Sequence, residues 1–190
     1  GRAATAMQLL LELGLLAEVL PEVVALDGVP QPPEFHPEGD VWTHVKILLD
    51  GLQESSATLA WAALLHDIGK PSTYEVADRI RFNRHDAVGA AMAEKVCRRL
   101  RMSNAETETI STLTAQHMRF RNVKDMRASK LKRFLRQPDF AELLELHRLD
   151  CLASHGELDL YEFCREKMAE AERARGRVVA ADVDPEDRLV

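Results

Sequence analysis

Residues 59–68 read LAWAALLHDI, the most hydrophobic stretch with a helical pattern in the chain. We expect a helix from Thr58 to Ile68 with apolar side chains on every side, so this helix should lie at the centre of the fold. It ends in a histidine and an aspartate, His66 and Asp67. Burying an ionised carboxylate without a partner costs on the order of several kcal/mol, and a metal cation is the strongest candidate for compensating that cost. The sequence therefore predicts a buried metal site at the end of the central helix.

Most of the remaining chain also has the composition and periodicity of helices. Aromatic residues make up only 5% of the 190 residues, while Ala, Leu, Glu and Arg are plentiful, and this balance favours helix over sheet. We expect helices over residues 3–16, 41–52, 85–100, 103–117, 129–136, 139–154 and 157–175, with a short segment over 23–26. Four prolines exclude a regular helix from residues 28–40. Residues 74–82 alternate weakly and predict a small hairpin, so the fold class is all-α, a helical bundle with at most that hairpin.

Residues with the chemistry of helix caps stand before three of these helices. Ser55 and Ser56 are candidate caps for the central helix, and Asn83 is a candidate for the helix that starts near His85. Ser103 and Glu106 have the spacing of a capping box. We expect one domain, organised as an N-terminal helical segment and proline-rich loop (1–40), a main domain (41–175) and a tail (176–190).

Charge and cysteine content limit the classes of protein. The net charge of −6 gives no global positive field for nucleic acid. Three cysteines without a CxxC pair argue against a disulfide framework and a thiolate zinc site, so we expect Cys97, Cys151 and Cys164 to be small core residues in a reducing compartment, most simply the cytoplasm. No uncharged stretch approaches the ~20 apolar residues of a membrane span, so no membrane role is expected. The chain opens on Gly1-Arg2 without a methionine and is expected to be part of a longer protein.

Two further side chains join His66 and Asp67 as candidate metal ligands. His44 lies on the preceding helix, and Asp150 continues the apolar stripe of a later helix, which turns its carboxylate inward. His44, His66, Asp67 and Asp150 would form a mixed nitrogen and oxygen site. Such a site suits Mn²⁺, Fe, Co²⁺, Ni²⁺ or Mg²⁺ better than structural zinc, and four protein donors leave positions for water and substrate on a six-coordinate ion.

The order His44, His66-Asp67, Asp150 resembles the H…HD…D signature of the HD superfamily of metal-dependent phosphohydrolases. Residues 64–71, LLHDIGKP, resemble its central motif. The resemblance implies an all-helical fold and phosphomonoesterase or phosphodiesterase activity on nucleotides or RNA ends. It also implies that His85 and His117 correspond to the extra histidines of two-metal members, so that one or two ions are expected, and that Lys70 faces the substrate phosphate.

A closer resemblance covers residues 2–165. RAATAMQLLLELGLLAEVLPEV (2–23), QPPEFHPEGDVWTHV (31–45) and RLDCLASHG (148–156) resemble the region behind the catalytic head of bacterial CCA-adding tRNA nucleotidyltransferases and related poly(A) polymerases. The motif of that head, Gly-Ser followed by paired aspartates, does not occur in the chain. Nucleotide addition by this chain itself is therefore not expected.

Other charged and aromatic residues have weaker signals. Residues 119–136 hold eight basic side chains and one acidic one, Asp125, and a positive patch beside a phosphate site suggests binding of an RNA or nucleotide backbone, tRNA in particular; a solvated helix face is the alternative. The basic side chains are Arg119, Arg121, Lys124, Arg127, Lys130, Lys132, Arg133 and Arg136. His36 either covers the site or is a solvated loop residue, His147 and His155 are expected to be structural or exposed, and Trp42 and Trp61 are expected in the core.

The leading functional hypothesis is a metal-dependent phosphodiesterase or phosphatase. His44, His66, Asp67 and Asp150 hold a metal that lowers the pKa of a water, and the resulting hydroxide attacks phosphorus in line. Asp67 also takes a proton, while Lys70, His85 and His117 stabilise the transition state or the leaving oxygen. The expected substrate is a phosphomonoester, a 2′,3′-cyclic phosphate or a nucleotide phosphodiester. The alternative is a non-catalytic RNA-binding body of a nucleotidyltransferase, with a structural or vestigial metal site.

Overall fold

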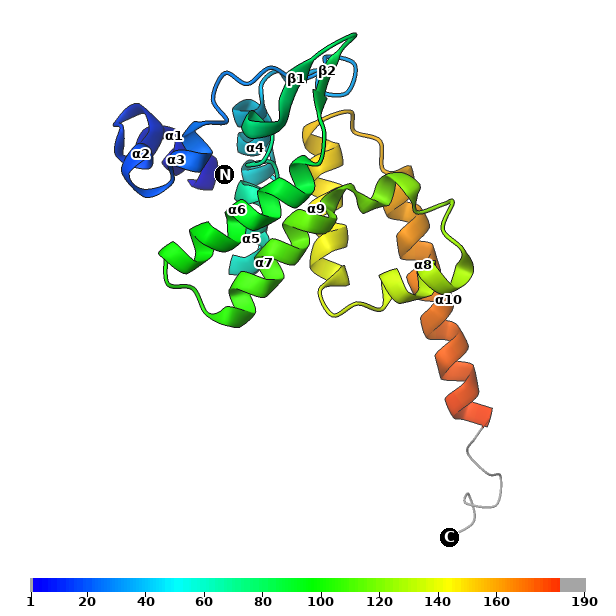
Figure 1. Ribbon diagram of the computed structural model, residues 1–190. Helices are drawn as coiled ribbons and strands as arrows, with labels where there is room; N and C mark the ends of the chain where they lie inside the picture. The colour runs from blue at the N-terminus through cyan, green and yellow to red at the C-terminus, as the bar shows by residue number, and fades with distance from the viewer. Residues whose placement is uncertain (1, 182–190) are drawn as a thin grey trace.

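The structure, a computed structural model, describes residues 2–181. Within that range the regular secondary structure is helical apart from one two-stranded hairpin (Figure 1), which confirms the predicted fold class. The α-helices are α1 (Arg2–Glu12), α2 (Leu15–Val19), α3 (Pro21–Val24), α4 (Val41–Asp50), α5 (Ala57–Leu65), α6 (His85–Arg99), α7 (Asn104–Gln116), α8 (Ala128–Leu135), α9 (Phe140–Ala153) and α10 (Asp159–Ala181). The strands β1 (Tyr74–Val76) and β2 (Ile80–Phe82) and the 3₁₀ segments η1 (Pro71–Thr73) and η2 (His117–Asn122) complete the fold.

Helix α5 is the centre of the bundle, as its sequence predicts. It packs against α4, α7 and α9, and its buried side chains are short or aliphatic, so these helices approach closely on several sides. Ser56 caps its first turn by accepting a hydrogen bond from the Leu59 N–H at 3.0 Å. Because other helices pack closely around α5, the residues that follow it start from a fixed position that is shielded from water.

Helices α6 and α7 form an antiparallel pair beside α5 (Figure 1). The expected capping box begins α7: the Ser103 hydroxyl accepts from the Glu106 N–H at 3.2 Å, and the Ser103 N–H donates to the Glu106 carboxylate at 2.9 Å. This pair carries one histidine at the start of α6 and another just past the end of α7. The two ends meet on the same side of the bundle.

The first three helices form a separate cluster at one side of the molecule (Figure 1). The Trp42 indole N–H on α4 donates to the Gln8 side-chain oxygen on α1 at 3.0 Å, which fixes the cluster to the bundle. The following loop is irregular, as its prolines predict, and returns to α4 through a bridge between Pro30 and Asp40. Asp40 then caps α4 by accepting from the Thr43 N–H at 2.9 Å.

The hairpin is the expected antiparallel ribbon, with Tyr74 opposite Phe82 and Val76 opposite Ile80. Two strands of three residues are marginal in isolation, so the position of this hairpin depends on what its base contacts. The Phe82 ring lies 5.8 Å from the Tyr74 ring and 6.3 Å from the His85 ring. The base of the hairpin is thereby fixed against the start of α6.

Four local expectations were wrong. The first helix does not continue to residue 16, because Gly14 has a φ of 72° and separates α1 from α2. Asn83 does not cap α6: the residue at that position is Arg84, whose φ of 62° places it in the left-handed region without a side-chain cap. The central helix stops at Leu65 instead of Ile68, so Asp67 lies in a turn.

The fourth difference concerns the end of the chain. Helix α10 continues to Ala181, six residues past the expected end, and runs away from the bundle (Figure 1). The rest of the predicted tail, 182–190, lies outside the described residues. Among the described helices, none combines the length and apolar character that crossing a membrane would need.

The core contains the residues that the sequence assigned to it. All three cysteines are buried and free, and Trp42 is 2% exposed. Trp61 is partly buried and packs against the core. The rings of Phe120 from η2, Phe134 from α8 and Phe140 from α9 contact one another within the same core.

Candidate metal centre

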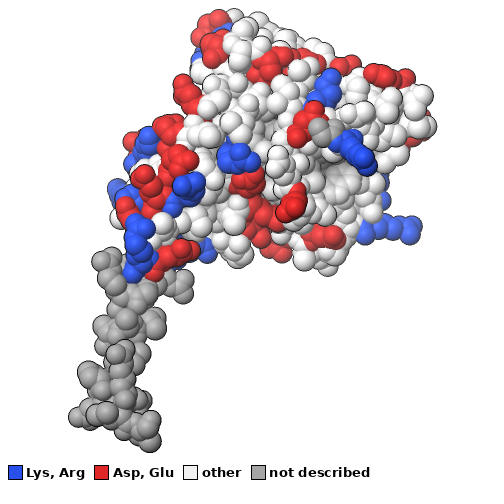
Figure 2. All heavy atoms as spheres, turned by 180° about the vertical axis from the view of Figure 1, so that it is seen from behind, with Lys and Arg blue, Asp and Glu red and all other residues white. Residues whose placement is uncertain are grey.

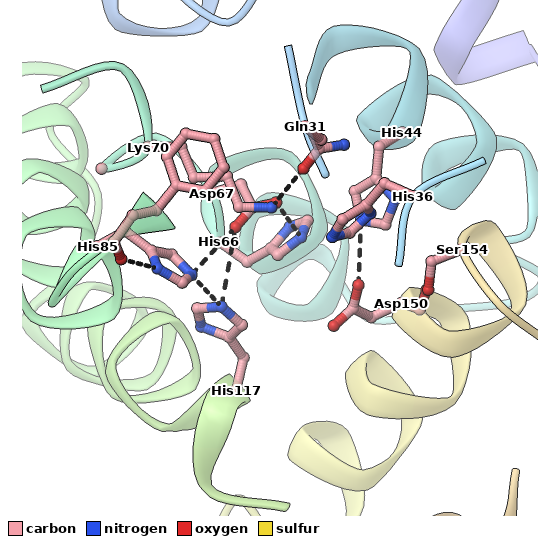
Figure 3. Close-up of polar contacts among 12 residues, drawn as sticks. Gln31, His36, His44, His66, Asp67, Lys70, His85, His117, Asp150 and Ser154 are labelled. Carbon is pink, nitrogen blue, oxygen red and sulfur yellow. Dashed lines mark hydrogen bonds and ion pairs between the residues drawn. The ribbon is translucent and has the colours of Figure 1, made fainter. Parts of the chain in front are cut away.

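Five structural elements deliver the six predicted ligands to one place (Figure 3). His44 comes from α4, His66 and Asp67 from the end of α5, and Asp150 from α9. His85 is the first residue of α6, and His117 is the first of η2. All four histidines and Asp67 are buried. The structure therefore brings together every residue that the sequence proposed as a ligand.

A close backbone approach determines how the turn after Asp67 meets α6. A Cβ atom on Gly69 would lie 2.2 Å from the His85 carbonyl oxygen and 2.7 Å from the Gly89 nitrogen. No side chain fits in that space, because both neighbouring atoms belong to the backbone. Glycine at position 69 therefore allows the turn that carries Asp67 to lie against the first turn of α6, which carries His85.

Each of the four histidines has its Nδ1 atom engaged by an acceptor. His66 Nδ1 donates to the Ala63 carbonyl at 2.9 Å, His85 Nδ1 to the Phe82 carbonyl at 2.8 Å, and His117 Nδ1 to the Thr114 carbonyl at 2.7 Å. His44 Nδ1 lies 2.7 Å from a carboxylate oxygen of Glu38. A carbonyl oxygen only accepts, so the proton must be on Nδ1, and the Nε2 lone pair is left to face the site.

The Nε2 atoms and carboxylates form two neighbouring groups, each of which could hold a metal ion. The ligand atoms of His44, His66 and Asp150 lie within 4.8 Å of one another, and so do those of Asp67, His85 and His117. Asp67 connects the groups, because its Oδ2 is 3.2 Å from His66 Nε2 and its Oδ1 is 3.5 Å from His85 Nε2. The sequence predicts a single four-ligand set of Asp67, His44, His66 and Asp150. The structure instead places Asp67 between the other three ligands and the histidine pair.

Several of these atoms are left without a satisfactory partner by the protein alone. His44 Nε2 and His66 Nε2 are buried and make no hydrogen bond to any described residue; His44 Nε2 is 3.0 Å from Asp150 Oδ1, but as an ion-pair contact without hydrogen-bond direction. His85 Nε2 and His117 Nε2 face each other at 3.2 Å. With both Nδ1 atoms protonated, this pair requires a second proton on one ring or a cation between them. The donor set fits a divalent cation.

The electrostatics of the site favour charged carboxylates. Burial alone would raise the pKa of Asp67, but His66 and Lys70 outweigh it and hold that pKa well below its usual value. Burial also acts on Asp150, and there the contact with His44 is the main cause of a pKa far below the ordinary range. Both carboxylates are therefore ionised at neutral pH.

The imidazoles of the site differ in their charge state. Burial, reinforced by the nearby His66, lowers the pKa of His117 to about 4, so this ring is neutral at pH 7 and its Nε2 can act as a ligand. Burial also lowers the pKa of His44, but Asp150 and the hydrogen bond to Glu38 outweigh it and raise that pKa to about 9. A cation bound at His44 must therefore displace a proton.

Lys70 is a buried residue of the site and not an ordinary lysine at a helix end. Only 5% of Lys70 is exposed. Its Nζ donates to Asp67 Oδ2 at 2.7 Å and to the Gln31 side-chain oxygen at 2.6 Å, and it lies 5.4 Å from the centre of the Phe82 ring. Gln31, from the loop before α4, was not anticipated by the sequence analysis. Its role depends on a contact across 39 residues, which no local pattern signals.

Glu38 is a second residue of the site that the sequence alone does not reveal. One of its carboxylate oxygens accepts from His44 Nδ1 at 2.7 Å and from His36 Nδ1 at 2.9 Å. The His36 and His44 rings meet edge to face at 5.1 Å. Of the two alternatives for His36, the structure supports a residue that covers the site. The general need of a ligand histidine for an Nδ1 acceptor points to a carboxylate, but the sequence does not say which of the several in this loop it is.

A cavity of about 540 Å³ opens over the second group of ligands. Asp67, His85, His117 and Asp150 line its inner part, together with Lys70. His147 also lines it and is stacked on the Phe120 ring at 4.0 Å, and its burial lowers its pKa to about 4. His155 lies at the exposed rim, where its Nδ1 accepts from the Glu157 N–H at 3.0 Å. A cavity of this volume is large enough for a nucleotide-sized ligand.

The basic segment 119–136 does not act as one surface. Arg119 lies over the Phe134 ring at 4.4 Å, and Lys124 pairs with Asp159 at 2.7 Å. Arg121 lines the cavity, and α8 carries exposed basic residues elsewhere. On the face that Figure 2 shows, Lys and Arg are interspersed with Asp and Glu and do not form a continuous patch.

A family model described as "HD domain" matches residues 39–182. The chain belongs to the HD domain family. The match includes all six candidate ligands, while Gln31, Glu38 and the helices α1–α3 precede its first residue. An HD domain accounts for the helical bundle and for the His-Asp pair at the end of its central helix.

The HD domain and the segment before it are also similar to curated bacterial proteins. The chain is 34% identical over 180 residues to the "Multifunctional CCA protein" of Burkholderia pseudomallei (strain 1106a). It is 36% identical, over the same length, to the protein of that name from Burkholderia ambifaria (strain MC40-6). Each alignment covers 90% of this chain and 42% of the relative. The chain thus spans about two fifths of the length of these relatives.

Proposed function

We propose that this HD domain is a metal-dependent phosphohydrolase that acts on nucleotide or RNA-end phosphate esters. The observation that carries the proposal is the donor set: Nε2 atoms whose partner nitrogens are already protonated converge with two ionised carboxylates at the floor of an open cavity. A divalent cation held there would supply a Lewis acid for a phosphoryl oxygen and lower the pKa of a water molecule.

Other side chains of the domain would bind the substrate, act as ligands and limit the access of water. Lys70, held by Asp67 and Gln31, places a positive charge at the inner wall of the cavity, where it can contact phosphoryl oxygens. His117 is neutral at pH 7 and is therefore suited to be a metal ligand and not a proton donor. His36 and Phe35, from the proline-rich loop, line the same cavity and would limit the access of water.

The preferred substrates are a phosphomonoester, a 2′,3′-cyclic phosphate and a nucleotide phosphodiester. This choice is supported by the cavity volume and by the names of the relatives, which are CCA proteins. We expect the metal to be Mn²⁺, Fe, Co²⁺, Ni²⁺ or Mg²⁺, because these ions suit mixed nitrogen and oxygen sites. One ion or two would fit, because the ligands form two groups that share the neighbourhood of Asp67.

The test is hydrolysis of bis(p-nitrophenyl) phosphate and of a 2′,3′-cyclic mononucleotide by the metal-stripped protein, with each divalent ion added back in turn. Asp67→Asn keeps the shape of the side chain but removes its charge, and kcat/KM should fall by at least about 100-fold. The matched control is Asp125→Asn, which changes a surface acid of no predicted role. Far-UV circular dichroism and bound-metal content, measured on both variants, separate loss of the site from loss of the fold.

A second candidate function is a non-catalytic RNA-binding body within a longer nucleotidyltransferase-like protein. It is favoured by the alignment, which covers 42% of relatives that are named CCA proteins. In that case the wild-type protein would hydrolyse neither phosphodiester with any divalent ion, yet would retain tRNA in a filter-binding assay. Neutralising the basic residues of 119–136 would then weaken retention and lower its salt dependence.

A further inference from the structure

Three arginines at the mouth of the cavity are not used by the proposed chemistry. Arg79 and Arg81 come from the hairpin and Arg121 from η2, and all three line the same cavity as Asp67 and His117. Arg81 and Arg121 are 40 residues apart in the sequence, yet both line this opening. Such convergence of positive charge needs a reason, because like charges at one opening repel.

The side chain of η2 that faces the cavity is determined by helix geometry. In a 3₁₀ segment residues three apart lie on the same side. His117, Met118, Phe120 and Arg121 all line the cavity. His117 and Phe120, three apart, are the buried pair of η2, whereas Arg121 is exposed. Arg121 therefore lies at the solvent-exposed part of the same cavity that the buried His117 lines more deeply.

The hairpin brings the other two arginines over the same opening. Its base is fixed by Phe82, which contacts Lys70 and the His85 ring. Arg81 Nη2 pairs with Asp78 at 2.6 Å, but its Nε is buried and has no hydrogen-bond partner among the described residues. A buried donor without a partner calls for an explanation, and an anion bound by Arg81 in the cavity that it lines would supply the missing acceptor.

The nearby acids neutralise the three arginines only in part, because Asp78 is the one described acid paired with any of them, and it pairs with Arg81. Among the described residues, no hydrogen bond or ion pair joins Arg79 or Arg121 to another side chain. Of the two acidic residues at the rim, Asp159 already pairs with Lys124 at 2.7 Å. Glu157 is then the one remaining acid among the described residues that line the rim, and Glu157 together with Asp78, the partner of Arg81, does not balance three guanidinium groups.

We propose that Arg79, Arg81 and Arg121 form a subsite for a second phosphate group, distinct from the phosphate that is hydrolysed at the ligand floor. The substrate class is therefore a phosphate ester that carries a neighbouring phosphodiester, such as the last linkage of an RNA strand, and not a mononucleotide. Guanidinium groups bind phosphate oxygens through charged, often bidentate hydrogen bonds. This inference rests on the proposed function, because it assigns the floor of the cavity to the scissile phosphate.

The experiment compares three substrates that end in the same 2′,3′-cyclic phosphate. The first is a mononucleotide, the second is a dinucleotide with a normal phosphodiester linkage, and the third is the dinucleotide with an uncharged methylphosphonate linkage. For the wild-type protein, kcat/KM should be at least about tenfold higher for the charged dinucleotide than for the uncharged one, equivalent to about 1.4 kcal/mol. Because the two dinucleotides differ in one charge, contact area alone cannot produce that ratio.

Variants then locate the subsite. Arg121→Gln and Arg79→Gln should each move the ratio between charged and uncharged dinucleotides toward one. The matched control is Arg133→Gln, an exposed arginine of α8 that does not line the cavity, and it should keep the wild-type ratio. A wild-type ratio near one, or an equal loss of preference in Arg133→Gln, would overturn the subsite.

A separate readout distinguishes failure of the subsite from failure of the proposed function. Binding of the two dinucleotides to the wild-type protein and to Arg121→Gln is measured by calorimetry with metal removed by a chelator, so that no turnover occurs. If the wild type cleaves none of the three substrates but binds the charged dinucleotide tightly in an Arg121-dependent manner, the phosphohydrolase assignment fails and the subsite stands. If cleavage occurs without preference and binding is equal, the subsite fails and the phosphohydrolase assignment stands.

Discussion

Replacing Gly69 with alanine tests how the fold sets the distance between Asp67 and His85. The added Cβ would lie 2.2 Å from the His85 carbonyl oxygen and 2.7 Å from the Gly89 nitrogen, whereas ordinary van der Waals contacts begin at about 3.4 Å. The turn must therefore move by more than about 1 Å. Both opposing atoms are backbone, so no change of rotamer relieves the clash. We expect the free energy of unfolding to fall by about 3 kcal/mol, at the upper end of the range for overpacking.

The assay is urea unfolding followed by far-UV circular dichroism, with metal removed by a chelator. For a protein of this size the loss corresponds to a drop of roughly 6–12 °C in Tm. Metal affinity should fall in the same variant, because the displaced turn separates Asp67 Oδ1 from His85 Nε2, now 3.5 Å apart.

Gly89→Ala is the matched control on the opposite side of the same contact. Its Cβ would lie 3.3 Å from the Gly69 nitrogen and 3.4 Å from a Thr114 methyl carbon, which is tight but does not overlap. Alanine also favours the interior of α6 by up to about 1 kcal/mol over glycine, so the two effects should nearly cancel. The reasoning is refuted if Gly69→Ala is as stable as the wild type, or if Gly89→Ala loses more free energy of unfolding than Gly69→Ala does.

Three further predictions concern Glu38, His147 and Ser103. Glu38→Gln weakens the acceptor of His44 Nδ1, so competition with a chelating dye should show metal affinity reduced by about tenfold or more; the exposed Glu34→Gln is its control, and equal affinities would contradict the role of Glu38. The pKa of His147 is about 4 in the folded protein and about 6.5 unfolded, so its contribution to stability is complete above pH 6.5 and is lost as the pH falls to 4. Urea unfolding of the metal-free protein at a series of pH values measures this effect. Between pH 6.5 and pH 4, the free energy of unfolding of His147→Gln should fall by up to about 3 kcal/mol less than that of the wild type. The same pH profile in both proteins would contradict the prediction. Ser103→Ala removes the capping box of α7 and should lower the free energy of unfolding by about 1 kcal/mol, whereas Ser55→Ala, which alters no observed cap, should have no effect.

The sequence determines the helical bundle well because most of its signals are local or periodic. The apolar run before His66 predicts a central helix, and the spacing of Ser103 and Glu106 predicts the start of α7. The errors occur where a single backbone conformation decides the outcome. Gly14 could have continued a helix at small cost, and only its φ of 72° ends α1. Arg84 adopts a left-handed conformation that side-chain chemistry does not signal for arginine.

The candidate ligands were predictable from residue type and order, whereas the groups that orient them were not. His66 and Asp67 stand out because polar residues end an apolar helix. Glu38 and Gln31 lie in an irregular loop, and their contacts to His44 and Lys70 exist only in the folded chain. The division of the ligands into two groups is likewise a property of the three-dimensional arrangement of α4, α9 and η2.

Three of the imidazoles take their Nδ1 acceptor from the residue three positions earlier in their own segment: Ala63 for His66, Phe82 for His85 and Thr114 for His117. The tautomer of each of these three rings is therefore determined by a short segment of the chain around it. Distant changes in the core can alter the spacing between rings without altering which nitrogen each ring presents. An engineer who transplants one of these tetrapeptides to another helix end would carry over a ring already set for coordination, whereas the fourth ring, that of His44, would need its carboxylate built anew.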